Sequence, residues 1–232
     1  MIKNISLFTL VIFTLFSFTN QTKPKPVAKK AVAKSTTPAA KKTTKISVNS
    51  KTKKEEILEV STDFGKMYIW LYNATPLHKA NILKLAKNGF YDSTTFHRII
   101  AGFMIQGGDP NSKDNDPYND GAGGPDYTIP HEIRDSIKHE KGAICAARTG
   151  NPAMASSSCQ FYICHDTRGT SGLNGQYTVY GMVMKGLDVI DKIIEQPTGQ
   201  NDRPIKNIVM KVKVLEKTLA QIKTEYGYTP KM

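Results

Sequence analysis

"TTFHRIIAGFMIQGGD", residues 94–109, is the stretch of sequence that decides the fold. Its large apolar residues predict two short strands, Thr95–Ile100 and Phe103–Gly107, joined by a tight turn. Arg98 and Gln106 interrupt this apolar pattern. Burying a guanidinium without a partner is costly. Arg98 therefore predicts either a surface ion pair or a functional site at the edge of the hairpin.

Short strand patterns continue on both sides of this stretch. Residues 55–71 form two alternating runs around a turn at 63–65, which predicts a hairpin. Further strands are predicted at residues 142–148, 159–165, 177–186 and 205–216. Many short strands of this kind predict a mostly β or α+β protein, either an antiparallel barrel or a sandwich.

Two helices and one long loop complete the predicted pattern. One helix is predicted after Thr75 as N-cap, with Pro76 at its first position and Gly89 just beyond its end. A second helix fits residues 187–196. Residues 108–132 are rich in Asp, Asn, Gly and Pro and predict an irregular connection. They lack the ligand spacing of a calcium loop, so we expect turns rather than a metal site there.

The excess positive charge lies almost entirely in the N-terminal segment. The chain has 32 basic and 20 acidic residues, and twelve of its lysines, but none of its acids, fall in residues 1–54. The rest of the chain is therefore neutral overall. This distribution does not favour a globular basic surface for nucleic acid, and no nucleic-acid partner is expected.

The first 19 residues have the pattern of a signal peptide. Lys3 precedes an apolar run from Ile5 to Phe18, which is shorter than the ~20 residues that a membrane-spanning helix needs. We therefore predict a signal peptide at 1–19 and an exported protein of the periplasm or cell envelope. The alternative is that the segment stays uncleaved and anchors the protein.

Residues 20–54 are dominated by Lys, Ala, Thr and Pro and contain no aromatic residue. Such a composition cannot bury enough apolar surface to fold, so it predicts a disordered tether. The plain interpretation is a solvated spacer; the alternative is weak electrostatic contact with anionic envelope surfaces. The predicted folded domain spans 55–216, and 217–232 is expected to be a short C-terminal extension.

The common catalytic motifs are missing from the sequence. It has no GxSxG, HExxH, Walker or CxxC sequence. None of its five histidines stands at zinc-ligand spacing from another, so no metal is expected. His97 is predicted to be a satisfied structural histidine on the strand face opposite to Arg98. Cys145, Cys159 and Cys164 fall in apolar runs and predict small buried core residues.

Three blocks of the sequence resemble the cyclophilins, the cyclosporin-type peptidyl-prolyl cis/trans isomerases, in order and spacing. They are "FHRIIAGFMIQGGD" (96–109), "GAICAARTGNPAMASSSCQFYICH" (142–165) and "LNGQYTVYGMVMKGLDVIDKI" (173–193). The resemblance covers residues 55 to about 216. It is closest to the bacterial, exported branch, and it implies an eight-stranded antiparallel barrel capped by two α-helices.

The resemblance also implies the roles of individual residues. Arg98 would be the catalytic residue, with Gln106 as its hydrogen-bonding neighbour. The residues implied to bind the proline peptide are Phe103, Met104, Gln106, Ala147, Gln160, Tyr162, Leu173 and Tyr177. Outside the family context, each aromatic residue would more often belong to a core and Gln106 to a solvated strand face.

Isomerisation explains why an arginine belongs in this apolar hairpin. Rotation about an X–Pro bond crosses a barrier of roughly 18–20 kcal/mol because it destroys amide resonance. No bond is broken, so no nucleophile, metal or cofactor is required. A rigid, permanently charged donor aimed at the proline nitrogen interacts most strongly with the twisted state, in which the nitrogen lone pair is free.

The sequence departs from the family pattern at several positions. Tyr177 stands where the family often has His, Arg148 replaces a frequent Asn, and Ala101 replaces a frequent Pro. No Trp occurs near Ser171-Gly172, so tight cyclosporin binding is not expected. The leading hypothesis is a monomeric isomerase that assists folding of exported proteins. The alternative is a proline-peptide binding module or holdase chaperone whose turnover is incidental.

Overall fold

The structure is a computed structural model that describes residues 53–114 and 116–230. The predicted signal peptide at 1–19 and all but the last two residues of the predicted tether at 20–54 lie outside these ranges. No helix within the described ranges is both long enough and apolar enough to cross a membrane.

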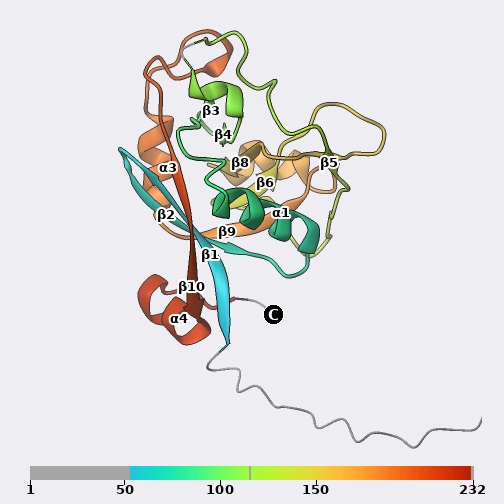
Figure 1. Cartoon of the computed structure of the whole chain (residues 1–232), viewed down its shortest axis with the longest axis vertical. Coiled ribbons are helices and arrows are strands. Elements are labelled where there is room, and N and C mark those ends of the chain that lie inside the picture. Colours follow the sequence, from blue (N-terminus) through green and yellow to red (C-terminus); the bar gives the residue numbers. More distant parts are fainter. Residues whose placement is uncertain (1–52, 115, 231–232) are drawn as a thin grey trace, which may run out of the picture. The chain divides into compact units, whose positions relative to one another are not determined.

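Eight antiparallel strands form one sheet, in the order β10-β1-β2-β9-β6-β8-β4-β3 (Figure 1). In chain order these are β1 (Lys54–Thr62), β2 (Gly65–Leu71), β3 (Arg98–Ile100), β4 (Met104–Gly107), β6 (Ala143–Ala146), β8 (Phe161–Cys164), β9 (Val179–Lys185) and β10 (Lys211–Thr218). A second small sheet pairs β5 (Thr128–Ile129) with β7 (Ser156–Ser157). The predicted mostly β, antiparallel fold is confirmed.

The two edge strands of the large sheet, β3 and β10, are joined by the residues that precede each of them. Phe96 N donates to Ile208 O at 3.0 Å, and Met210 N donates to Thr94 O at 2.8 Å. Both predicted strands therefore begin later than expected, at Arg98 and Lys211, because their first residues form this junction instead of the regular ladder. Because this junction links the two edge strands, the sheet curves into a cyclophilin-like barrel.

Two helices pack on the barrel core, as predicted. Helix α1 (Pro76–Lys87) and helix α3 (Leu187–Ile194) lie on either side of strand β10 in Figure 1. Both contribute buried residues to the same large apolar cluster inside the barrel. The shorter helical segments are α2 (Thr167–Thr170) and the 3₁₀ turns η1 (Pro110–Lys113), η2 (Ser171–Leu173) and η3 (Gln200–Asp202).

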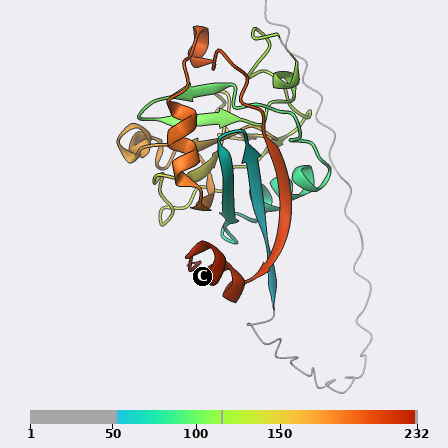
Figure 2. The ribbon, with the colours of Figure 1, turned by 90° about the vertical axis from the view of Figure 1, so that its left-hand side faces the viewer.

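The segment after residue 216 is folded against the sheet. It completes β10 and forms helix α4 (Leu219–Tyr226), which lies beside the far ends of the long strands (Figure 2). Thr218 and Gln221 form a capping box at its start, a sequence signal for a helix N-terminus. Ile222 is fully buried against Ile57 and Trp70. This segment was expected only as an extension, although Leu219, Ile222 and Tyr226 recur at helical spacing and all three pack in the same apolar cluster.

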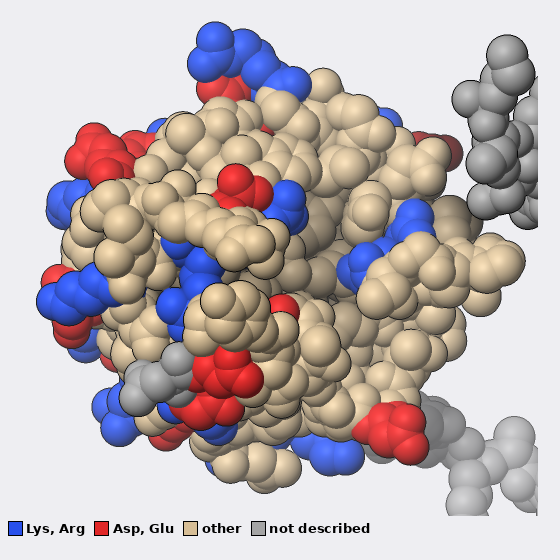
Figure 3. Space-filling model, turned by 90° about the horizontal axis from the view of Figure 1, so that it is seen from above, with Lys and Arg blue, Asp and Glu red and all other residues tan. Residues whose placement is uncertain are grey.

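The charged side chains on the face seen from above are mixed. Figure 3 shows basic and acidic groups interspersed among uncharged ones around a hollowed centre, rather than one continuous basic area. This mixture agrees with the equal numbers of basic and acidic residues after residue 54.

Candidate active site

The register of three neighbouring strands separates a core face from a site face. Ile99, Ile105 and Ile163 lie opposite one another on β3, β4 and β8, and all three belong to the cluster inside the barrel. Arg98, Gln106 and Tyr162 form the next row. Because successive side chains on a strand point to opposite faces, this second row lies outside the barrel.

The outer row forms part of a cavity of about 150 Å³ whose lining is both polar and apolar. Its lining residues are Arg98, Phe103, Met104, Gln106, Ala147, Arg148, Tyr162, Leu173 and Tyr177. The structure thus brings together every predicted site residue except Gln160, and it adds Arg148. Met104 and Tyr162 are nearly fully buried, whereas the Arg98 side chain is 40% exposed. We call this the first cavity.

Arg98 lies at the rim of the first cavity and has an acidic partner. Its Nε is 3.4 Å from Oδ2 of Asp202. Asp202 and its neighbour Asn201 both have left-handed backbone conformations, with φ of 58° and 60°, which Asp and Asn tolerate better than most residues. Gln106 lies opposite Arg98 in the register, but its amide donates to Gln160 instead. The expected hydrogen bond between Arg98 and Gln106 is not formed within residues 53–114 and 116–230.

Gln160 lies in a second, adjoining cavity of about 280 Å³. It accepts a hydrogen bond from Gln106 Nε2 at 3.2 Å and donates to the carbonyl oxygens of Gly121 and Gly123, both at 2.9 Å. The two cavities share Gln106, Ala147 and Arg148 as lining residues. The two cavities therefore adjoin along these residues.

The glycine wall of the second cavity is held from behind by a buried carboxylate. Asp109 is fully buried, and it accepts hydrogen bonds from the backbone N–H groups of Asn111, Gly121 and Gly123. A Cβ at Gly123 would collide with Asp109 and Asn111. Asp109, the last residue of the stretch 94–109, thus shapes the second cavity. This role of Asp109 was not predicted from the sequence.

Tyr162, at the floor of the first cavity, is braced by two residues that sequence reasoning missed. Its hydroxyl lies 2.9 Å from Nε2 of His139. The backbone N–H and Nδ1 of His139 both lie 2.9 Å from Oδ1 of Asn174. Because an amide oxygen can only accept, Nδ1 carries the proton and Nε2 accepts from Tyr162. Asn174 follows Leu173, so one chain of hydrogen bonds ties two walls of the cavity together.

Arg148 and Tyr177 form a stacked pair at the other side of the first cavity. The Arg148 guanidinium carbon lies 4.5 Å from the centre of the Tyr177 ring, a cation–π arrangement. Tyr177 in turn meets Tyr162 edge to face, with ring centres 6.0 Å apart. Tyr177 therefore keeps a packing role at the position where the family often has His.

His97 is buried, but it is not the satisfied histidine that we expected. Neither of its ring nitrogens has a hydrogen-bond partner within residues 53–114 and 116–230. Burial lowers its pKa, an effect that Asp109 and Asp120 oppose. The prediction of a satisfied structural histidine is therefore wrong.

The three cysteines are buried, as predicted. Burial raises the pKa of Cys145, and it raises that of Cys159 to about 11. These raised pKa values keep the thiols of Cys145 and Cys159 protonated and poorly nucleophilic at neutral pH. Within the described ranges no group of three or more His, Cys, Asp or Glu residues is arranged to hold a metal ion.

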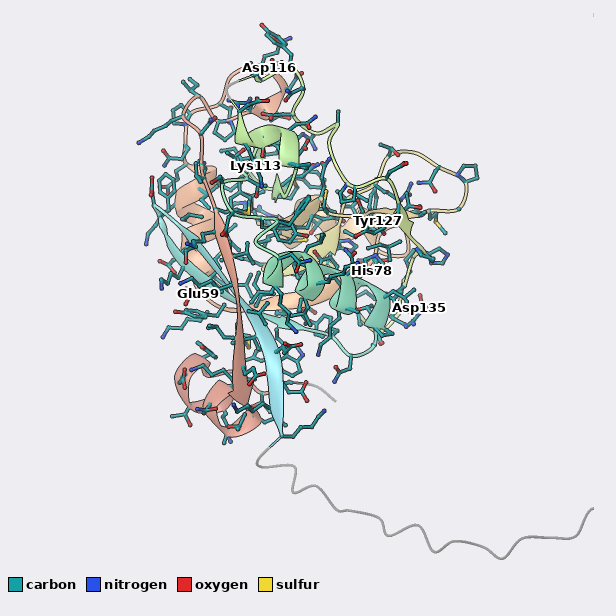
Figure 4. The ribbon with its side chains drawn as sticks, in the orientation of Figure 1. Glu59, His78, Lys113, Asp116, Tyr127 and Asp135 are labelled. Atoms are coloured by element: carbon teal, nitrogen blue, oxygen red, sulfur yellow. The ribbon has the colours of Figure 1, made fainter. Side chains whose placement is uncertain are left out.

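A Ser–His–Glu arrangement elsewhere in the fold is structural rather than catalytic. His78 Nδ1 lies 2.7 Å from Glu132 and its Nε2 lies 3.0 Å from Ser156 Oγ. All three residues are buried, and the void beside them measures only about 10 Å³, too small for a substrate. Glu132 also accepts from the N–H groups of Leu77 and His78, so it satisfies free donors at the start of α1. Figure 4 labels His78 on this helix.

Comparison with known proteins agrees with this geometry. The family model "Cyclophilin type peptidyl-prolyl cis-trans isomerase/CLD" matches residues 57–214. A peptidyl-prolyl cis-trans isomerase of Acinetobacter baylyi is 35% identical over 170 residues, which cover 68% of this chain and 85% of that protein. The peptidyl-prolyl cis-trans isomerase-like 2 protein of Rhizopus delemar is 34% identical over 166 residues, which cover 69% of this chain and 29% of that protein.

A solved structure has the same fold. The crystal structure of a cyclophilin type peptidyl-prolyl cis-trans isomerase of Cryptosporidium parvum, obtained in the presence of the dipeptide Ala-Pro, aligns with a TM-score of 0.59 and 27% identity. The alignment covers 69% of this chain and 98% of that structure. The family match, the relatives and the shared barrel together show that this chain belongs to the cyclophilin-type peptidyl-prolyl cis-trans isomerases.

Proposed function

We propose that the protein accelerates rotation about X–Pro bonds in exported polypeptides, with Arg98 as its catalytic residue. The observation that carries this proposal is the position of Arg98, a half-exposed guanidinium at the rim of a small cavity that Phe103 and Met104 also line. The Cryptosporidium parvum structure, obtained with Ala-Pro, supports a proline peptide as the ligand of this cavity.

In the proposed complex the proline ring occupies the first cavity. Phe103, Met104 and Leu173 supply its apolar walls and Tyr162 its floor. Ala147 lies beside the residue before the proline, and Gln106 and Gln160 bind the peptide backbone. Burying the ring fixes one side of the X–Pro bond, so that the bond twists against a held ring.

Arg98 acts on the proline nitrogen during that rotation. In the planar amide the nitrogen lone pair is delocalised and accepts a hydrogen bond poorly; in the twisted state it is free. The guanidinium therefore stabilises the transition state more than either ground state, which is the condition for catalysis. Asp202 contacts Nε of Arg98, and this leaves the terminal nitrogens of the fork for the substrate.

The proposed cellular setting is the periplasm or cell envelope. The signal-peptide pattern at residues 1–19 and the Lys-rich composition of 20–54 support it. Export would place the isomerase domain among newly translocated chains, in which slow X–Pro isomerisation delays folding.

Two measurements test the proposal. Exchange NMR on a short X–Pro peptide gives the cis/trans rate with and without enzyme, and acceleration is the expected result. Fractionation of cells that express the full chain gives its location. Peptide binding without acceleration would favour the binding-module alternative, and recovery of the full chain only from the cytoplasm would contradict export.

A further inference from the structure

We propose that Arg148 makes this enzyme prefer peptides that carry an acidic side chain two residues before the proline. The inference rests on the proposed placement of proline in the first cavity. Arg148, the one charged residue that lines the second cavity in the described part of the chain, would determine this specificity.

Arg148 supplies the only charged side chain among the residues that line the second cavity in the described part of the chain. The other lining residues are uncharged and include Tyr127, Thr128, Ser157, Ser158 and Gln160. They offer hydroxyl, amide and backbone groups. Tyr127 comes from the loop before β5, where Figure 4 labels it. Asp126, its neighbour in sequence, is exposed and does not line the cavity.

Arg148 is held in place but has no acidic partner. Its Nε donates to the Gln176 carbonyl at 3.4 Å, and its guanidinium stacks on Tyr177. None of the ion pairs found within residues 53–114 and 116–230 includes it. Arg98, by contrast, already faces Asp202. The two terminal nitrogens of Arg148 are therefore free to bind a carboxylate as a fork.

The position of the acidic residue follows from the geometry of an extended peptide. Alternate side chains of an extended chain point the same way. A proline ring that enters the first cavity therefore aligns with the side chain two residues earlier. The two cavities adjoin along Gln106, Ala147 and Arg148, so that side chain reaches the second cavity beside Arg148. The residue directly before the proline points the other way.

The test compares two peptides that differ only in charge, acetyl-Glu-Ala-Pro-Phe-amide and acetyl-Gln-Ala-Pro-Phe-amide. We expect the full-length enzyme at low salt to bind and turn over the Glu peptide about 3- to 10-fold better, the range for a half-buried charge pair. This preference should shrink at 1 M salt, where the Debye length is about 3 Å. Exchange NMR gives the rates and an NMR titration gives the affinities, without a coupling protease.

Variants of Arg148 separate charge from packing. Arg148→Ala should bring the Glu/Gln ratio to about 1, and Arg148→Glu should reverse it and favour a Lys peptide. Arg134→Ala is the matched control, because Arg134 bonds to backbone carbonyls outside both cavities; its ratio should match that of the wild type. Moving the Glu to the position directly before the proline should abolish the preference.

The possible failures point to different causes. Equal rates and affinities for the Glu and Gln peptides, or a preference that persists in Arg148→Ala, would overturn the specificity inference while isomerase activity stands. Absence of acceleration for both peptides would instead overturn the proposed function. In that case the affinities alone decide whether Arg148 binds a carboxylate.

Discussion

His139 Nε2 lies 2.9 Å from the hydroxyl of Tyr162, so the floor of the first cavity is braced from behind by a buried imidazole. The same imidazole is fixed by Asn174 on the neighbouring turn. The cavity is thereby pre-organised by residues that do not line it. Pre-organised contacts lower the ordering cost of binding.

This brace predicts a coupling between His139 and Tyr162. Removing one partner leaves the other buried and unpaired, which typically costs about 1–3 kcal/mol. We therefore expect His139→Leu and Tyr162→Phe each to lower the free energy of unfolding. The double variant should lose less than the sum, because it leaves neither group of this pair unsatisfied. Urea unfolding of the four proteins measures the coupling, with exposed His131→Leu as control. Strictly additive losses would show that the contact contributes nothing.

Arg98→Ala should separate binding from turnover. Loss of one pre-organised charged donor commonly lowers kcat by on the order of 10²–10³. Peptide affinity and melting temperature should change little, because Arg98 is half-exposed and its ion pair with Asp202 lies at the surface. Arg98→Lys should also be impaired, since an ammonium cannot replace the planar fork. Phe103→Ala is the contrasting variant, with losses in affinity and turnover together. Near wild-type turnover of Arg98→Ala would contradict the proposed mechanism.

Stability should fall on mild acidification. Burial lowers the pKa of His78, His97 and His139 in the folded protein, whereas histidines in the unfolded chain titrate near 6.5. Above that pH both states are neutral at these residues, and below it the unfolded state binds more protons. Each histidine should therefore contribute up to about 1.4 kcal/mol of destabilisation per pH unit below about 6.5. Urea unfolding between pH 7.5 and 5 tests this, and His97→Gln should reduce the slope. Stability that increases over this interval would refute the assignment.

Helix α4 should be part of the cooperative fold. Ile222 is fully buried against Ile57 and Trp70, and truncating such a residue typically costs about 2–5 kcal/mol. We expect Ile222→Ala to lower the melting temperature markedly, while exposed Lys223→Ala should not. Peptide turnover at 25 °C should persist in both variants, because α4 contributes no lining residue to either cavity. Equal melting temperatures of the two variants would show that the helix is peripheral.

The N-terminal segment should be dispensable for catalysis on short peptides. The sheet begins at Lys54, and every lining residue of both cavities lies after residue 97. A chain that starts at Lys53 should keep the kcat/KM of the full-length protein, measured on the same X–Pro peptide. A large loss of kcat/KM would show that residues 1–52 contribute to the site.

The sequence by itself determined the fold and most of the first cavity. The alternation in residues 94–109 put Ile99 and Ile105 on one strand face and Arg98 and Gln106 on the other, because successive side chains of a strand must point to opposite faces. Helix α1 was predictable for a similar reason: Thr75 and Pro76 mark its start locally. Residues from the three blocks that resemble cyclophilins line one cavity, because the barrel places their strands side by side.

Only the tertiary structure decided which polar groups meet across the chain. The partner of Arg98 is Asp202, the partner of Tyr162 is His139, and the group that satisfies the start of α1 is Glu132. Each pair joins segments far apart in sequence, through loops whose composition fixes no distance. Periodicity reports burial along one element, whereas a hydrogen bond needs atoms from two elements within about 3 Å. That condition is met only when the barrel has closed.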